Sequence, residues 1–156
     1  MVSEQVGNVG PLRGGNATFH HLGFVVASIS AVAEEFAAFM TARQDGPIIH
    51  DPIQRVRVAF FSPHAPQNPV FELVEPAGDT SPVSSFLKKG GGLHHVCYEL
   101  DDLEVGLQQA QTVGLVMVAA PAPAVAFGDR RIAWVCSRNR LLMELLERHP
   151  RSASGM

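Results

Sequence analysis

The sequence predicts an α+β fold made of two tandem βαβββ modules, and the first observation behind this prediction is an internal repeat. The segment "FHHLGFVV" at residues 19–26 and the segment "GLHHVCYEL" at residues 92–100 both carry a histidine pair in an apolar, strand-like run. Between the two segments, His21 and His95 are 74 residues apart. Two copies of one pattern predict that the chain is built twice from one unit.

Two further matches support the repeat. At the same offset of 74 residues, "RVAFFS" (57–62) aligns with "RIAWVC" (131–136). Toward the end of each half, "FELVE" (71–75) aligns with "MELLE" (143–147) at an offset of 72 residues. We therefore expect two modules related by a pseudo-twofold axis.

The first module is expected to contain one helix and four strands. The apolar spacing from Ile29 to Met40 has helical periodicity, and Ser28 or Ser30 supplies the N-cap. Enrichment in β-branched and aromatic residues predicts strands at 18–26, 54–62 and 70–76, with a weaker strand near 47–51.

The second module repeats this order. Its helix carries apolar residues from Leu103 to Val113, with Asp101 or Asp102 as N-cap and Gly114 as the stop. Its strands are expected at 93–100, 115–121, 130–137 and 141–147.

These elements divide the chain into five parts. We expect a flexible leader at 1–17, a first module at 18–76, a linker with a short helix at 77–92, a second module at 93–148 and a tail at 149–156. The short helix in the linker is expected around Val83–Lys88.

The composition restricts the classes of function. The chain has 156 residues, 46% of them hydrophobic, and a formal net charge of −3, which gives no general attraction to nucleic acid or to anionic membranes. No apolar run approaches the length of about 20 residues that spans a bilayer. Two cysteines, Cys97 and Cys136, are too few for a disulfide scaffold. We expect a cytoplasmic protein with a small-molecule partner, and an exposed module edge predicts a homodimer.

Four polar residues occupy matched places in the two modules: His21 and His95 in the first strands, and Glu72 and Glu144 in the last strands. Two imidazoles and two carboxylates suit a divalent first-row metal, since they supply nitrogen and oxygen donors and leave positions for water or substrate. The spacing is too long for a local motif. The fold itself must bring the four together, and Co²⁺, Mn²⁺, Ni²⁺, Zn²⁺ and Fe²⁺ all accept this donor set.

Each residue has a simpler interpretation when taken alone. A histidine in an apolar strand is more often a core residue, and a glutamate beside a second glutamate is more often an edge charge. Because neighbours on a strand point to opposite faces, His94 and His95 are expected to face opposite sides of the sheet. Cys97 shares the face of His95, and core packing is its expected role. Loop cations, including Arg130 and Arg131, are expected to be solvated.

The segments "HHLGFVV", "FELVEPAGDTSPVSSFLKKGGGLHHVCYELDDLE" and "LLMELLE" resemble the vicinal oxygen chelate superfamily, which includes glyoxalases, bleomycin-resistance proteins and dioxygenases. They look most like the methylmalonyl-CoA epimerases and related glyoxalase-like proteins. The resemblance covers about residues 18–148 and implies a curved, eight-stranded cup around a metal site. It also selects the second histidine of each pair, so that His21, Glu72, His95 and Glu144 are the implied metal ligands.

The resemblance implies enolate chemistry in an isomerase, an epimerase or a glyoxalase-like lyase. A divalent metal binds the substrate carbonyl and stabilises the enolate that forms when a base removes the neighbouring proton. Glu144 is the first candidate for a catalytic base, with Glu72 as its partner across the metal. An acyl-CoA thioester or another small carbonyl compound is the implied substrate.

The chain departs from the epimerase pattern at two places. Some epimerases carry an extra acidic base where this chain has Val58, and the segment "APAVAFGDRR" replaces small polar residues at the expected pocket mouth. Two other functions therefore stay open. The same cup could sequester a small molecule, as resistance-type members do, or support a metal-dependent dioxygenase.

Overall fold

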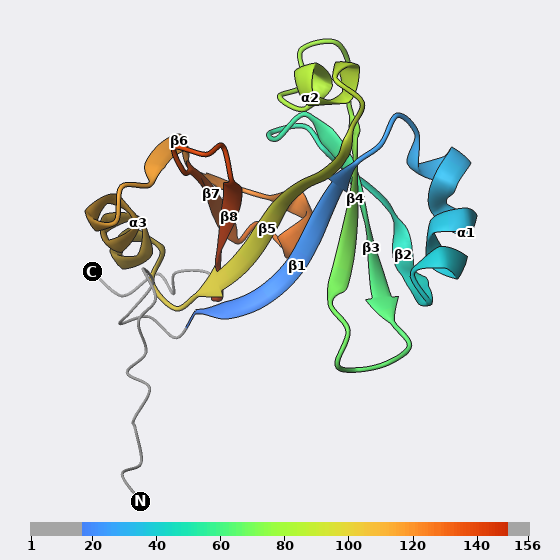
Figure 1. The fold of residues 1–156 in the computed structure, drawn as a ribbon, viewed down its shortest axis with the longest axis horizontal. Helices are drawn as coiled ribbons and strands as arrows, with labels where there is room; N and C mark the ends of the chain where they lie inside the picture. The colour runs from blue at the N-terminus through green and yellow to red at the C-terminus, as the bar shows by residue number, and fades with distance from the viewer. Residues whose placement is uncertain (1–16, 150–156) are drawn as a thin grey trace, which may run out of the picture.

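The structure, a computed structural model, describes residues 17–149 and contains one eight-stranded sheet with three α-helices. The strand order is β2-β3-β4-β1-β5-β8-β7-β6, so each half of the chain supplies four neighbouring strands. Strands β1 and β5 run antiparallel across the middle, while β1 pairs with β4 and β5 pairs with β8 in parallel. The sheet is strongly curved, and α1 and α3 lie at its opposite ends (Figure 1). The predicted α+β class and eight-stranded cup are confirmed.

The element order repeats between the halves. The first half contains β1 (Thr18–Val25), α1 (Ile29–Phe39), β2 (Ala42–Asp51), β3 (Val56–Pro63) and β4 (Val70–Pro76). After α2 (Ser84–Lys88), the second half contains β5 (Gly92–Leu100), α3 (Leu103–Thr112), β6 (Val116–Pro123), a short 3₁₀ turn η1 (Val125–Phe127), β7 (Arg131–Cys136) and β8 (Leu142–Glu147). Of the expected leader and tail, residues 1–16 and 150–156 lie outside the described residues.

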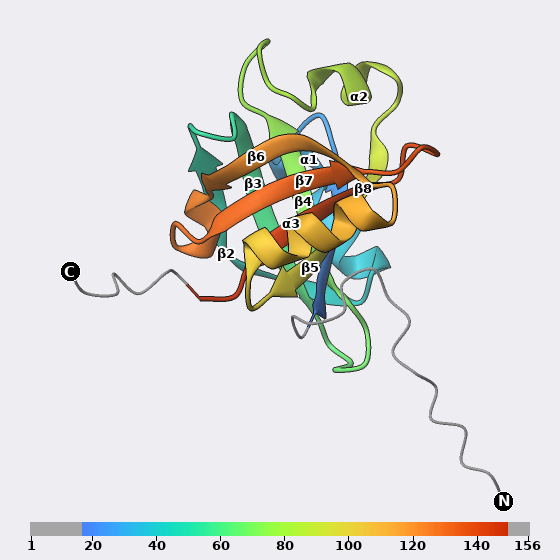
Figure 2. The ribbon, with the colours of Figure 1, turned by 90° about the vertical axis from the view of Figure 1, so that its left-hand side faces the viewer.

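Both long helices begin at side-chain caps that the sequence predicts. The hydroxyl of Ser28 accepts a hydrogen bond from the backbone N–H of Ala31, and the carboxylate of Asp102 accepts one from Val105. At the end of α3, Gly114 adopts a φ of 84°, a left-handed conformation that suits glycine, and its N–H donates to the carbonyl of Gln111. Helix α3 lies across the outer side of β7 and β8 (Figure 2).

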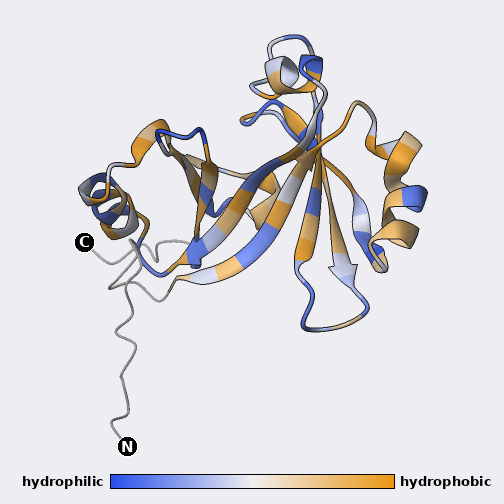
Figure 3. Ribbon diagram, viewed as in Figure 1, coloured by the Kyte–Doolittle hydropathy of each residue, from blue (hydrophilic) through white to orange (hydrophobic). Residues whose placement is uncertain are grey.

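The core is divided between the outer and inner faces of the curved sheet. On the outer face, α1 packs Ile29 against Phe61 and Leu73, while α3 packs Leu103 against Leu145. The two remaining clusters, one around Val58 and Val74 and one around Ile132 and Leu146, lie on the inner side. Polar residues interrupt the apolar central strands in Figure 3. The inner face therefore combines apolar packing with the polar side chains described below.

Strand β2 is longer than the sequence predicts. It begins at Ala42 rather than near residue 47, and its residues from Arg43 to Pro47 are exposed. This stretch forms the sheet edge and has no buried side, so apolar alternation gives no signal there. None of the described helices combines the length and the apolar character that a membrane-spanning segment needs.

Candidate metal centre and active site

The four predicted ligands lie on the four central strands of the sheet. His21 is on β1, Glu72 on β4, His95 on β5 and Glu144 on β8. In the strand register, Gly23 lies between Glu72 and His95, and Cys97 lies between His21 and Glu144. Two adjacent rows thus carry two ligands each, with a small residue in the middle of each row. The topology brings together four residues that are dispersed along the sequence, with Glu72 lying 51 residues after His21 and Glu144 lying 49 residues after His95.

The donor atoms of these side chains converge on one point. The two imidazole Nε2 atoms of His21 and His95 are 3.1 Å apart, and each is 3.2 Å from Oε2 of Glu72. Oε1 of Glu144 is 3.8 Å from Nε2 of His21. All four side chains are buried, with residue exposures between 0% and 4%. Four buried polar groups at this spacing form a compact set of nitrogen and oxygen donors.

The donor set fits a divalent cation. The ligand atoms of His21, His95 and Glu144 all lie within 4.8 Å of one another. Among the described residues, Oε1 of Glu144 is a buried oxygen without a hydrogen-bond partner. A buried carboxylate oxygen without a partner is costly, because its desolvation is not compensated. A cation bound between the imidazoles would compensate it, and His21, Glu72, His95 and Glu144 would hold that cation.

The pKa values of the two carboxyl groups are shifted in opposite directions. Burial opposes ionisation of Glu72, but the nearby imidazoles of His21 and His95 outweigh it and hold the pKa of Glu72 below its usual range. Burial raises the pKa of Glu144, and the charge of Glu72 raises it further. Burial also opposes charging of His21, yet its contact with Glu72 leaves the pKa of His21 raised overall. Glu144 is therefore the carboxyl group that more readily holds a proton.

The first histidine of each pair also belongs to the site, and the prediction that His94 faces away is wrong. Nδ1 of His94 lies 2.9 Å from Nδ1 of His95, and Nδ1 of His20 lies 2.8 Å from Nδ1 of His21. Each Nδ1 is bonded to Cγ, close to the backbone. The register of the β1–β5 pairing shifts at His20 and at His94, so strict alternation of faces does not hold at either histidine pair. Burial and the neighbouring His95 lower the pKa of His94 to about 4.

Aromatic rings pack against the imidazoles of His21 and His95. Phe60 packs edge to face on His21 with ring centroids 5.8 Å apart, and Trp134 packs in the same way on His95 at 4.7 Å. These two rings occupy matched positions in the repeat. Phe127 stacks on His21 with ring centroids 6.0 Å apart. The packing restricts rotation of both ligands.

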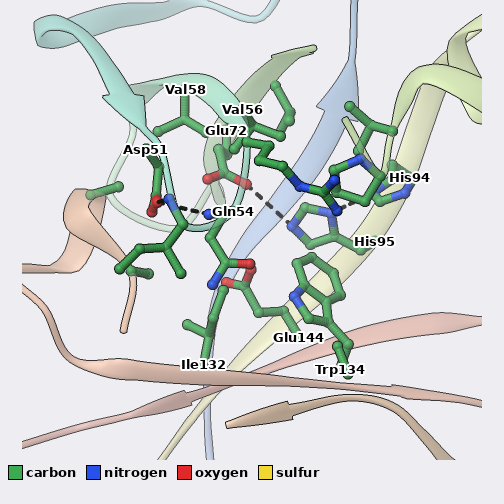
Figure 4. A pocket seen from close by; sticks show the side chains of 18 of the residues that line it. Asp51, Gln54, Val56, Val58, Glu72, His94, His95, Ile132, Trp134 and Glu144 are labelled. Atoms are coloured by element: carbon green, nitrogen blue, oxygen red, sulfur yellow. Dashed lines mark hydrogen bonds and ion pairs between the residues drawn. The ribbon is translucent and has the colours of Figure 1, made fainter. Parts of the chain in front are cut away.

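A cavity of about 360 Å³ opens beside the site. Glu72, His95 and Glu144 reach it together with a largely apolar wall that includes Val58 and Trp134 (Figure 4). The predicted contribution of "APAVAFGDRR" is confirmed, since Ala124, Ala126 and Phe127 line the cavity. Such a pocket suits a small, partly apolar molecule presented to the carboxylates.

Neither Val58 nor Cys97 presents an acid or a nucleophile to the cavity, because Val58 is apolar and Cys97 does not line it. Val58 is buried in the wall and provides an apolar surface where a base would be needed. Cys97 is fully buried, as predicted, and burial together with the nearby charge of Glu144 raises the pKa of its thiol.

One acid in the wall was not foreseen from the sequence. Asp51 lines the cavity, but its carboxylate accepts hydrogen bonds from the backbone N–H groups of Ile53, Gln54 and Val125. These bonds join the β2–β3 turn to η1 and occupy both oxygens, so Asp51 stabilises the pocket mouth. The sequence signal was the Asp-Pro pair at 51–52, which is typical of a turn.

Arg130 and Arg131 are held in ion pairs and are not among the residues that line the cavity. Arg131 binds Glu147 with an Nη2–Oε1 distance of 2.7 Å and also reaches Glu104 on α3 at 2.8 Å. Arg130 pairs with Glu99 at 3.0 Å. The expectation that these cations are solvated loop charges is therefore wrong, because Arg131 connects β7 to neighbouring elements and Arg130, just before β7, binds Glu99 on β5.

Comparisons with known proteins agree with this fold and site. Residues 20–134 match the family model of the glyoxalase/bleomycin resistance protein/dioxygenase superfamily. The chain belongs to this superfamily. Among characterised relatives, it is 26% identical over 130 residues to the ethylmalonyl-CoA/methylmalonyl-CoA epimerase of Cereibacter sphaeroides, covering 81% of this chain and 94% of the relative. It is 34% identical over 86 residues to the mitochondrial methylmalonyl-CoA epimerase of Dictyostelium discoideum, covering 53% of this chain and 51% of that one.

Solved structures share the fold. A hypothetical protein from Bacillus halodurans superposes with a TM-score of 0.75 at 24% identity, covering 89% of this chain and 99% of the other. The methylmalonyl-CoA epimerase from Mycobacterium tuberculosis superposes with a TM-score of 0.68 at 22% identity, covering 88% and 91%. The relatives from Cereibacter sphaeroides and Dictyostelium discoideum and the protein from Mycobacterium tuberculosis are epimerases, which are isomerases.

Proposed function

We propose that this chain is a divalent-metal-dependent epimerase that moves a proton at the carbon beside a carbonyl group. The observation that carries the proposal is the convergence of His21, Glu72, His95 and Glu144 on one buried point, with Oε1 of Glu144 left without a hydrogen-bond partner. A divalent cation held there supplies Lewis-acid polarisation of the substrate carbonyl, which lowers the pKa of the adjacent C–H.

The carboxylates of the chain perform the proton transfer. Glu144 reaches the cavity directly, and burial raises the pKa of its carboxyl group, which makes it a stronger proton acceptor than an exposed carboxylate. Glu72 reaches the same cavity from β4, which is separated from β8 by β1 and β5. Removal of the proton by one carboxylate and its return by the other would invert the carbon centre. The apolar wall keeps water from competing for that proton.

The substrate class follows from the cavity and from the relatives. A cavity of about 360 Å³ lies near the lower end of the range of roughly 300–1,000 Å³ for ligand sites. It accommodates a small acyl group bearing the reactive carbon. One methylmalonyl-CoA epimerase with the same fold, at a TM-score of 0.65, is described in complex with methylmalonyl-CoA. We therefore propose an acyl-CoA thioester or a similar small carbonyl compound as substrate.

The test is exchange of carbon-bound protons with solvent deuterium. The metal-loaded protein is incubated in D₂O with a panel of acyl-CoA thioesters and of α-keto and α-hydroxy acids, and deuterium incorporation is followed by mass spectrometry. The proposal predicts exchange at the carbon beside the carbonyl of at least one substrate. A cup that binds members of the panel tightly without exchanging any of them would instead favour sequestration.

We also propose that the chain forms a homodimer through its β6 edge. Strand β6 ends the sheet, and Val116, Met117 and Val118 on it are 62%, 42% and 56% exposed. An edge strand with exposed apolar side chains is a surface that a second copy can cover. Light scattering after size-exclusion chromatography should give twice the mass of the chain, and Val118→Lys should return it to the monomer mass.

A further inference from the structure

We propose that His20 and His94 are positioning residues that fix the orientation and the tautomer of His21 and His95. The inference rests on the proposed metal centre and adds two residues to it that do not bind the metal. Within each histidine pair, Nδ1 of the first ring faces Nδ1 of the second.

The contact occurs twice in the molecule with nearly the same geometry. In the pair on β1 the Nδ1 atoms are 2.8 Å apart and the rings are inclined by 81°, and in the pair on β5 the values are 2.9 Å and 87°. The ring centroids are 5.1 Å apart in both pairs. Two modules with different surroundings thus keep one arrangement of the histidine pair.

The direction of the hydrogen bond follows from the site. A neutral imidazole carries its single proton on one ring nitrogen and accepts on the other. The Nε2 atoms of His21 and His95 face the point where the ligand atoms meet, so both must be unprotonated to bind a cation. The proton of each ligand ring then lies on Nδ1 and needs an acceptor. Nδ1 of the preceding histidine is that acceptor, and the preceding ring keeps its own proton on Nε2.

The first histidine of each pair is itself held by aromatic contacts. His20 packs edge to face on Phe127 with ring centroids 5.6 Å apart, and His94 packs in the same way on Phe86 at 4.8 Å. These contacts fix the acceptor nitrogen beside the ligand ring before any metal binds. An acceptor that orients a ligand histidine in this way also raises the basicity of the ligand, and its loss typically lowers metal affinity by about 10- to 100-fold.

The two positions form a useful experimental pair. His94 lines the cavity, whereas His20 is not among the residues that line it. Replacement of His94 by Phe therefore alters the cavity wall as well as the hydrogen bond, while replacement of His20 by Phe leaves the wall unchanged. Phe retains an aromatic ring and removes the acceptor. Any effect common to both variants comes from the hydrogen bond.

The first experiment measures Zn²⁺ affinity, without substrate, for the wild-type chain and for His20→Phe, His94→Phe and His64→Phe. His64 is exposed and serves as the control. We expect losses of about 10- to 100-fold for His20→Phe and His94→Phe and no change for His64→Phe. Gln at either position, which restores an acceptor oxygen, should recover part of the loss. Affinities within twofold of wild type in both Phe variants would overturn the inference.

The second experiment needs no substitution, so it does not depend on whether a variant folds. In the Zn²⁺-loaded wild-type chain, ¹⁵N chemical shifts should identify His20 and His94 as neutral rings protonated at Nε2. Protonation of either ring at Nδ1 would reverse the hydrogen bond and overturn the inference. A wild-type chain that binds no Zn²⁺ at all would refute the metal centre itself, which separates the two failures.

Discussion

Gly23 lies directly opposite His95 in the β1–β5 pairing, and its lack of a side chain is what admits the His95 imidazole. A Cβ atom added at Gly23 would lie 2.0 Å from Cε1 and 2.3 Å from Nε2 of His95. At the matched position of the second row, Cys97 lies opposite His21. Small residues at these two positions leave room for the imidazole rings of His95 and His21.

Gly23→Ala should displace the His95 ring and weaken metal binding, because Nε2 cannot keep its place beside a methyl group. The overpacking should also lower the free energy of unfolding by about 1–3 kcal/mol. Calorimetric metal titration and urea unfolding measure the two effects. Gly46→Asn is the control, since Gly46 has open space around it and a φ of 73°, which Asn tolerates. Metal affinity in Gly23→Ala equal to that of the control would show that His95 is not a ligand in this position.

Removal of a ligand side chain should remove the metal. His95→Ala and Glu144→Ala should each be purified without bound metal and without exchange activity, since each deletes one of four converging donors. Elemental analysis of protein purified without chelator checks this, with His64→Ala as the matched surface control. Full metal occupancy in either variant would reject the assignment of that residue.

Glu144→Gln should separate metal binding from proton transfer. The amide keeps a carbonyl oxygen at the ligand position but cannot accept the substrate proton. We expect metal to remain bound while deuterium exchange falls by at least about 100-fold, the usual contribution of a general base. Glu72→Gln, compared in the same assay, shows whether the second carboxylate acts on the other face. If Glu144→Gln exchanges as fast as wild type, another group is the base.

Glu147 should contribute stability that acid removes. Its hydrogen bonds with Arg131 hold the pKa of Glu147 below the ordinary value of 4.5, so the unfolded chain binds this proton more readily than the folded chain. The contribution is complete above pH 4.5 and is lost as the pH falls through the folded pKa. Glu147→Gln should cost about 2 kcal/mol at pH 7 and much less at pH 3, as measured by urea unfolding. An equal cost at both values would show that the ion pair is not the cause.

The fold was predictable because the repeated segments lie in the buried, central strands of the sheet. Patterns such as "FELVE" and "MELLE" mark buried strands with one inward carboxylate, and the matched histidine pairs locate the central strands. The edge was less predictable. Residues 43–47 of β2 are exposed and have no apolar alternation, so the sequence there contains no signal for a strand.

The convergence of the four predicted ligands follows from the same repeat, whereas the contacts around them do not. Strand alternation predicts that His94 faces away from His95, but the β1–β5 register shifts at His94 and the two rings meet at Nδ1. Asp51 is similar, because its bonds to backbone N–H groups depend on how η1 of the other half approaches. Contacts between distant loops leave no periodic trace in the sequence.

We propose that one cation binds where the two halves of the chain meet. Anomalous diffraction from crystals grown with Co²⁺ or Mn²⁺ locates such a cation directly. We expect a single strong peak per chain, between Nε2 of His21, Nε2 of His95 and carboxylate oxygens of Glu72 and Glu144. A peak elsewhere in the chain, or no peak between these four side chains at saturating metal, would contradict it.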